Sequence, residues 1–346
     1  MNAPPPGEPA HVGPAPAPPP GRADRSRPAS GRRAGSRPAR RPLPPPSKEG
    51  TTLAGDAARG PALPRVPRPL GPVGPDPPHA AVRPSVRVEL AALEDPDLED
   101  TFTVAREAAP RAFLCANLGV VQLRDHGIEW AERAVEMIDA QAICIHANFL
   151  QEAIMPEGDH DARGCLDAIG TLCREFETPV IVKETGAGIS REVARRLWAA
   201  GVAAIDIGGL GGTSWARVEC IRSPETPQAR MGERFTDWGI PTVVSLREVA
   251  GTGPVIATGG LRSGLDMAKA LALGADLCGM ALPLLAPAME SGEAVERTID
   301  GFTKELAVAM FLSGARTVKS MRKVRTWITG TTRQMIEDTQ EIQNGS

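Results

Sequence analysis

The chain has 346 residues and a formal net charge of −3, a length that exceeds a single small domain and suits one large α/β barrel with an appendage. Residues 1–86 hold 24 of the 34 prolines, no aromatic residue, and 13 Lys or Arg against 5 Asp or Glu. Such a segment cannot bury enough apolar surface to offset its chain entropy. We therefore predict that residues 1–86 are disordered and that residues 87–346 form the folded domain.

The charge and the cysteines exclude several classes of protein. The basic residues of the first segment are scattered and lack aromatic partners for base stacking, which argues against nucleic-acid binding. No run of 18 apolar residues occurs and no apolar stretch follows the N-terminus, so we expect no membrane span, no secretory signal and a cytoplasmic location. The six cysteines have no CxxC spacing, which predicts reduced thiols.

From residue 111 onward, short apolar strands alternate with helical patterns. The predicted strands are residues 112–118, 142–146, 179–183, 203–208, 254–258 and 277–280, and helical patterns cover residues 129–138, 167–175, 191–200 and 264–273. This spacing is typical of βα units, and continuous apolar strands indicate a parallel sheet buried on both faces. We predict the later part of an α/β (β/α)₈ TIM barrel whose first one or two βα units are missing or unrecognisable.

One segment interrupts this alternation. Residues 212–238 show neither a strand nor a clean helix pattern, and they contain Pro224 and Pro227 together with several arginines. Long loops of this kind often act as lids or subunit contacts. We predict a long irregular loop here.

Four polar side chains lie at the end of the predicted strand at residues 142–146 or just past it. His146 ends the strand, and Asn148, Gln151 and Glu152 would follow at its C-terminal end, where parallel α/β proteins bind ligands. Glu152 is a natural ligand for a hard cation such as Mg²⁺. The alternative interpretation is a capping cluster that opens a helix at Gln151.

Two glycine-rich segments, residues 207–214 and 257–264, follow consecutive strands. Glycines let backbone N–H groups wrap a phosphate, while Thr213 adds a hydroxyl and Arg262 a positive charge. Each segment taken alone is also compatible with a tight turn. Two such segments at neighbouring strand ends favour a phosphate-bearing cofactor.

Lys183 and Asn117 end two further strands. Lys183 would project over the barrel mouth, where it can hold a phosphate or the negative part of a ring, unless it is a surface residue. Asn117 can hydrogen-bond a planar heterocycle or cap a helix. Nucleophile-elbow, Walker and zinc motifs are absent from the sequence, so the chemistry must come from a bound cofactor.

Together these motifs resemble those of one family, the type 2 isopentenyl diphosphate isomerases, which are FMN-dependent (β/α)₈ enzymes. The resemblance covers roughly residues 90–331. Its motifs are residues 116–119 with Gln122, 146–152 continuing to 156–159, 182–184, 208–215, 238–242, 259–264 and 279–283.

The resemblance implies a function and a set of site residues. Members interconvert isopentenyl and dimethylallyl diphosphate with Mg²⁺ and with FMN kept reduced by NADPH or NADH, and they form homo-tetramers or larger assemblies. By this likeness His146, Asn148 and Gln151 are the catalytic and substrate-binding residues, and Glu152 holds Mg²⁺. The implied FMN contacts are Asn117, Lys183, Thr213, Gly260, Leu261, Arg262, Ala281 and Leu282.

The chain also departs from this family. Its members open with an Arg-Lys and His motif and two further strands, and none of these features is found before residue 91. The abrupt change to Pro, Arg, Ala and Gly is typical of an out-of-frame reading of GC-rich DNA, so residues 1–86 are interpreted as a possible frameshifted segment. Two alternatives stay open: another FMN-binding TIM-barrel oxidoreductase, and an inactive truncated remnant of the isomerase.

Overall fold

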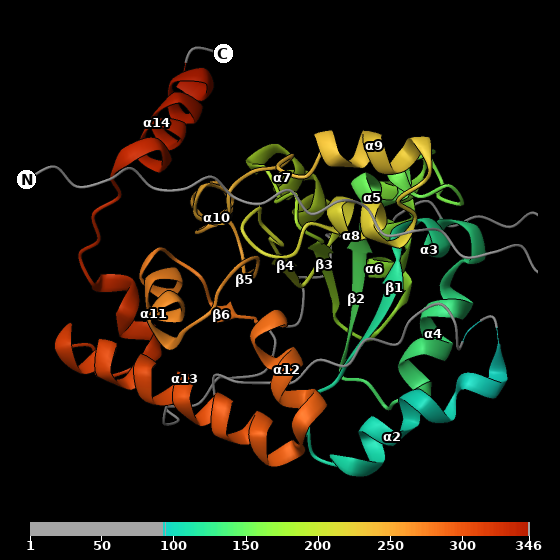
Figure 1. The fold of residues 1–346 in the computed structure, drawn as a ribbon, viewed down its shortest axis with the longest axis horizontal. Coiled ribbons are helices and arrows are strands. Elements are labelled where there is room, and N and C mark those ends of the chain that lie inside the picture. The colour runs from blue at the N-terminus through green and yellow to red at the C-terminus, as the bar shows by residue number, and fades with distance from the viewer. Residues whose placement is uncertain (1–92, 94, 345–346) are drawn as a thin grey trace, which may run out of the picture. The chain divides into compact units, whose positions relative to one another are not determined.

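The computed structural model describes residues 93 and 95–344 (Figure 1). Six parallel strands form one sheet in which each strand pairs with the next along the chain. The strands are β1 (Cys115–Gly119), β2 (Ala142–Ala147), β3 (Val180–Glu184), β4 (Ala204–Asp206), β5 (Val255–Ala257) and β6 (Leu277–Cys278). This sequential parallel order is that of a (β/α)₈ barrel wall, and the described residues supply six of its strands.

Side chains alternate between the two faces of the sheet. Ile143 and Ile145 of β2 are fully buried in the large core between the sheet and its helices. On the opposite, inner face lies a smaller buried cluster made of Cys115, Ala142, Ile181 and Ala204, one residue from each of four consecutive strands. Lys183 and Asp206, two residues beyond Ile181 and Ala204, therefore share this inner face at the end of the strands, at the barrel mouth.

Helices follow the strands as the βα alternation requires. They are α2 (Asp100–Ala108), α3 (Val120–His126), α4 (Ile128–Met137), α5 (Phe149–Ile154), α6 (Cys165–Glu175), α7 (Arg191–Ala200), α8 (Trp215–Arg222), α9 (Pro227–Arg234), α10 (Thr242–Val249), α11 (Gly264–Ala272), α12 (Leu282–Glu290), α13 (Gly292–Leu312) and α14 (Gly330–Asn344), with 3₁₀ turns η2 (Pro96–Leu98) and η3 (Val318–Lys323). Among these described helices, none combines the length and apolar character needed to cross a membrane.

Local capping explains where several helices begin and end. The Ser190 hydroxyl accepts a hydrogen bond from the backbone N–H of Val193 at the start of α7, and Gly201 ends that helix in the left-handed conformation. Ser263 caps α11 in the same way, through the N–H of Asp266. These caps fix the points where the chain turns between strand and helix.

The parallel α/β barrel predicted from the sequence is confirmed, and all six predicted strands are present within one to three residues of their expected bounds. Within the described residues, β1 and β6 each pair on one side only. The predicted disorder of residues 1–86 lies outside the described residues.

The prediction of an irregular loop at residues 212–238 is wrong. This segment contains α8 and α9, and each helix begins at a hydroxyl cap, Ser214 for α8 and Thr226 for α9, with Pro227 in the first turn of α9. Proline suits that position because its missing N–H has no partner in a helix anyway. The caps were visible in the sequence, but the short helices lack a clear apolar period.

Candidate functional site

Polar side chains line the inner face of the sheet where the strands end. Gly119 pairs with His146 in the register of β1 and β2, His146 with Lys183 in that of β2 and β3, and Lys183 with Asp206 in that of β3 and β4. Side chains in register on neighbouring strands share a face. His146, Lys183 and Asp206 therefore lie side by side at the mouth.

His146 is oriented by Asn117. The Asn117 Nδ2 atom lies 3.1 Å from His146 Nδ1, and since an amide nitrogen only donates, Nδ1 is the acceptor. The ring proton then sits on Nε2, which faces the position of Gly119: a Cβ built there would lie 3.4 Å from Nε2. Gln122 Oε1 lies 1.8 Å from the same Cβ position, so the His146 ring and the Gln122 side chain adjoin at this turn, where an N–H donor on Nε2 suits an anionic ligand.

The start of α5 holds a second polar group. Glu152 is buried, and its Oε1 accepts a 2.9 Å hydrogen bond from Asn148 Nδ2 while its Oε2 accepts a 3.1 Å bond from the backbone N–H of Asp159. Asn148 occupies the N-cap position of α5, yet its side chain makes no capping bond. The capping interpretation of this run is therefore wrong for Asn148, whose amide orients the carboxylate instead.

This carboxylate has the chemistry expected of a magnesium ligand. Each carboxylate has about four lone-pair sites, so two donors leave about half of them unused. The described residues contain no group of three or more His, Cys, Asp or Glu side chains able to hold a metal. Mg²⁺ is commonly held by one or two carboxylates together with substrate phosphates, so the single carboxylate fits an ion shared with a diphosphate.

Gln151 contacts a residue that sequence reasoning missed. Its Nε2 donates a 2.8 Å hydrogen bond to Oε1 of Glu219, a buried carboxylate on α8. The second oxygen of Glu219 lies 2.9 Å from Arg222 Nε, an ion pair without hydrogen-bond geometry. Glu219 shares the buried face of α8 with Ala216 and Cys220. An acidic residue at that helical spacing was the available signal, and it was lost because α8 was not predicted.

The two glycine-rich segments pack against each other. Gly259 and Gly260 have φ angles of 99° and 88°, and a Cβ on them would lie 2.1 Å from Gly209 O and 2.2 Å from Gly211 O. Only glycine permits this backbone contact. The two segments are therefore not independent tight turns, because the close backbone contact between them restricts the conformation of both.

Arg262 joins these segments. Its Nη1 donates to Gly260 O at 2.8 Å and its Nη2 to Gly211 O at 3.0 Å, while the side chain stays exposed. The backbone of residues 211–213 is also exposed, Thr213 included. A phosphate here would meet exposed N–H groups and one cation, so these residues fit the phosphate end of a flavin nucleotide.

The remaining predicted cofactor residues lie at neighbouring strand ends. Leu261 is a buried core residue, so only its backbone is available to a ligand. Ala281 and Leu282 are exposed where α12 begins after β6. Because β5 and β6 are paired, their exits occupy adjacent positions at the mouth.

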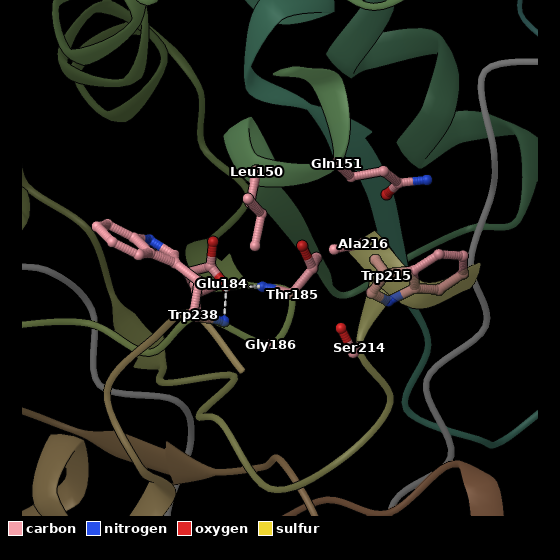
Figure 2. A pocket seen from close by; sticks show the side chains of 10 residues that line it. Leu150, Gln151, Glu184, Thr185, Gly186, Ser214, Trp215, Ala216 and Trp238 are labelled. Carbon is pink, nitrogen blue, oxygen red and sulfur yellow. Dashed lines mark hydrogen bonds between the residues drawn. The ribbon is translucent and has the colours of Figure 1, made fainter. Parts of the chain in front are cut away.

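A small pocket opens beside the mouth, between α5, the turn after β3 and the start of α8 (Figure 2). Glu184 lies in it, and its Oε2 accepts hydrogen bonds from the backbone N–H groups of Thr185 and Ala187, the latter at 2.7 Å. Burial of this carboxyl raises the pKa of Glu184 to about 7, although these hydrogen bonds favour its ionised form. Figure 2 shows Leu150 and Gln151 on one side of this turn and Ser214 and Trp215 on another.

Comparisons with known proteins agree with this geometry. Residues 111–327 match the family described as FMN-dependent dehydrogenase. An isopentenyl-diphosphate delta-isomerase of Methanoregula boonei is 64% identical over 256 residues, which is 72% of this chain and 71% of that protein. Proteins of the same name from Methanosarcina mazei and Archaeoglobus fulgidus are 52% and 49% identical over 252 and 259 residues, covering 72% and 75% of this chain and 69% and 75% of their own.

Proposed function

Because the chain belongs to the FMN-dependent dehydrogenase family and, within it, to the isopentenyl-diphosphate delta-isomerases, we propose that it interconverts isopentenyl and dimethylallyl diphosphate with reduced FMN and Mg²⁺. The observation that carries this proposal is the buried Glu152 carboxylate, held by Asn148 and the Asp159 N–H with lone pairs to spare. A magnesium-bound diphosphate needs such a group, and an oxidase of small hydroxy acids does not.

The diphosphate would be bound by side chains of β2 and α5. Glu152 would hold Mg²⁺, which would supply positive charge to offset that of the diphosphate. The His146 Nε2–H would donate to a phosphate oxygen, an orientation fixed by Asn117. Gln151, held by Glu219, would orient the remainder of the substrate.

FMN would be held by the strand ends that follow β2. Its phosphate would lie against residues 211–213 and 260–262 and the start of α12, with Thr213 and Arg262 as polar contacts and Ala281 and Leu282 beside them. Lys183 and Asn117 would contact its ring. When bound, reduced FMN would supply the acid and base for the proton transfers.

Three further features belong to this proposal. NADPH or NADH would reduce FMN to its active state. Isomerisation involves no net electron transfer, so the reduced FMN would not be consumed by turnover. The enzyme would act in the cytoplasm, where isoprenoid precursors and reduced nicotinamides are available. It would assemble as a homo-tetramer or larger, as the resemblance to its family implies.

The test is an anaerobic assay of the full chain with isopentenyl diphosphate, FMN and dithionite, followed by NMR of the products. We expect dimethylallyl diphosphate to form with MgCl₂ and its formation to cease with excess EDTA or with oxidised FMN. Flavin-bound protein that oxidises 2-hydroxy acids or nucleotides and leaves isopentenyl diphosphate unchanged would contradict the isomerase and favour another FMN-dependent oxidoreductase.

A further inference from the structure

Asp206 ends β4 as a buried carboxylate at the barrel mouth, and it connects three strand ends. Only 9% of the residue is exposed. Its Oδ1 accepts a 3.2 Å hydrogen bond from the backbone N–H of Gly208 and a second bond from the hydroxyl of Thr258, which follows β5. Burying a carboxylate costs free energy unless it is hydrogen-bonded or paired with a positive charge, so an acidic residue at this position indicates a specific role.

Asp206 lies beside Lys183 on the inner face. The two residues are register partners on β4 and β3, two positions beyond Ala204 and Ile181 of the inner cluster. The Cys144 thiol lies near both of them. A hydrogen bond with Cys115 and burial raise its pKa well above the usual range, and among the weaker influences the Asp206 carboxylate raises it further while the Lys183 ammonium lowers it. The Asp206 carboxylate and the Lys183 ammonium therefore both lie close to the Cys144 thiol on the inner face of the sheet.

Asp206 also fixes the first glycine-rich segment. The Gly208 N–H donates both to Asp206 and to the Thr258 hydroxyl that Asp206 itself binds, and these bonds hold the point where this segment leaves β4. Gly208 O accepts the N–H groups of Gly186 and Gly188 from the turn after Lys183. The carboxylate thus links the strand end that carries Lys183 with the segment that carries Thr213. In the proposed function these two residues contact opposite ends of the same cofactor.

We propose that Asp206 is a positioning residue for the flavin site, which holds Lys183 and residues 208–213 in register and offsets the charge of the Lys183 ammonium. The inference rests on the proposed function, because it requires FMN at this mouth. A reduced flavin that has lost its N1 proton is more negative than oxidised flavin, so a lone ammonium would favour the reduced form strongly. With Asp206 beside it, the net charge of the pair is zero and this preference is moderated.

The test is the ratio of FMN affinities in the oxidised and reduced states, obtained for the full chain from its Kd for oxidised FMN and its midpoint potential. Asp206→Asn should raise the preference for reduced FMN at least tenfold, which corresponds to a positive shift of about 30 mV for a two-electron couple. Thr258→Val removes the hydroxyl that donates to Asp206 without changing the charge. It should weaken both forms alike and leave the ratio within about threefold of wild type.

A second pair of variants covers the case in which Asp206→Asn alone does not fold. Lys183→Gln should lower the preference for reduced FMN at least tenfold, and adding Asp206→Asn, which leaves neither charge, should bring the ratio back within about threefold of wild type. If the Asp206 and Lys183 variants bind FMN and the ratio of their affinities for oxidised and reduced FMN equals that of wild type, the role of Asp206 is overturned and the proposed function stays intact. A wild-type chain that binds no FMN would overturn both.

Discussion

Gln151 Nε2 donates a 2.8 Å hydrogen bond to Glu219 Oε1, joining α5 to α8 across 68 residues of sequence. An amide side chain has two chemically different ends, and a bond from its nitrogen to a carboxylate determines which end lies where. Glu219 is buried and lies against Arg222, so it remains an acceptor rather than a solvent-exposed charge. The orientation of Gln151 is thus set by a helix outside the strand unit that carries it.

Replacing Glu219 tests this relationship. We expect Glu219→Ala to lower kcat roughly 10- to 100-fold, because a misplaced substrate contact commonly costs that much, while FMN content stays at the wild-type level. Glu219→Gln keeps an acceptor oxygen and should recover part of the loss. Steady-state kinetics with flavin absorbance measure both effects, and the exposed Glu225→Ala serves as the control. Equal kcat in wild type and Glu219→Ala would show that Gln151 needs no such partner.

The sequence predicted the strands well because their apolar character is continuous and their exits are polar. It also predicted that Asn148 and Glu152 would lie close together after β2, and the two side chains are hydrogen-bonded. Glu219 escaped prediction because its contact with Gln151 depends on how α8 packs, which no local pattern reveals. Asp206 was also missed, because the sequence does not reveal which residue of the neighbouring strand lies beside it. The strand register identifies that residue as Lys183.

The magnesium ligand can be tested separately from the flavin. Glu152→Gln should abolish Mg²⁺-dependent turnover and leave the bound flavin in place, because the carboxylate serves the diphosphate. The amide still accepts from the Asp159 N–H, so folding should persist. Turnover against MgCl₂ concentration, with flavin absorbance of the same samples, measures this, and exposed Glu177→Gln is a control. Loss of FMN together with activity would assign Glu152 to the cofactor instead.

Flavin retention tests the glycine-rich segments. Arg262→Ala and Thr213→Ala should each weaken FMN binding by about 1 to 3 kcal/mol, the range for a hydrogen bond to a charged group. Arg262→Lys keeps the charge but loses the fork that bonds Gly260 O and Gly211 O, so it should recover only part of the affinity. Fluorescence titration gives the Kd values. Unchanged affinity in both alanine variants would place the phosphate elsewhere.

The raised pKa of Glu184 predicts a pH dependence of stability. The folded protein holds this proton up to a pH of about 7, whereas the unfolded chain releases it near 4.5. The resulting stabilisation is fully present below pH 4.5 and is lost as the pH rises through 7. Glu184→Gln removes this titration, so the Tm of wild type should fall relative to the variant between pH 4.5 and 8. Thermal melts measure it, with exposed Glu175→Gln as the control. Parallel curves for wild type and Glu184→Gln would refute the burial of this proton.

The most direct test of isomerisation follows solvent hydrogen. Moving a double bond by protonation at one carbon and deprotonation at another brings solvent hydrogen into the product, so the full chain is incubated anaerobically in D₂O with isopentenyl diphosphate, MgCl₂, FMN and dithionite. We expect NMR to show dimethylallyl diphosphate carrying deuterium, with no net oxidation of the flavin. Unlabelled, unconverted isopentenyl diphosphate after prolonged incubation with flavin-bound protein would contradict an isomerase.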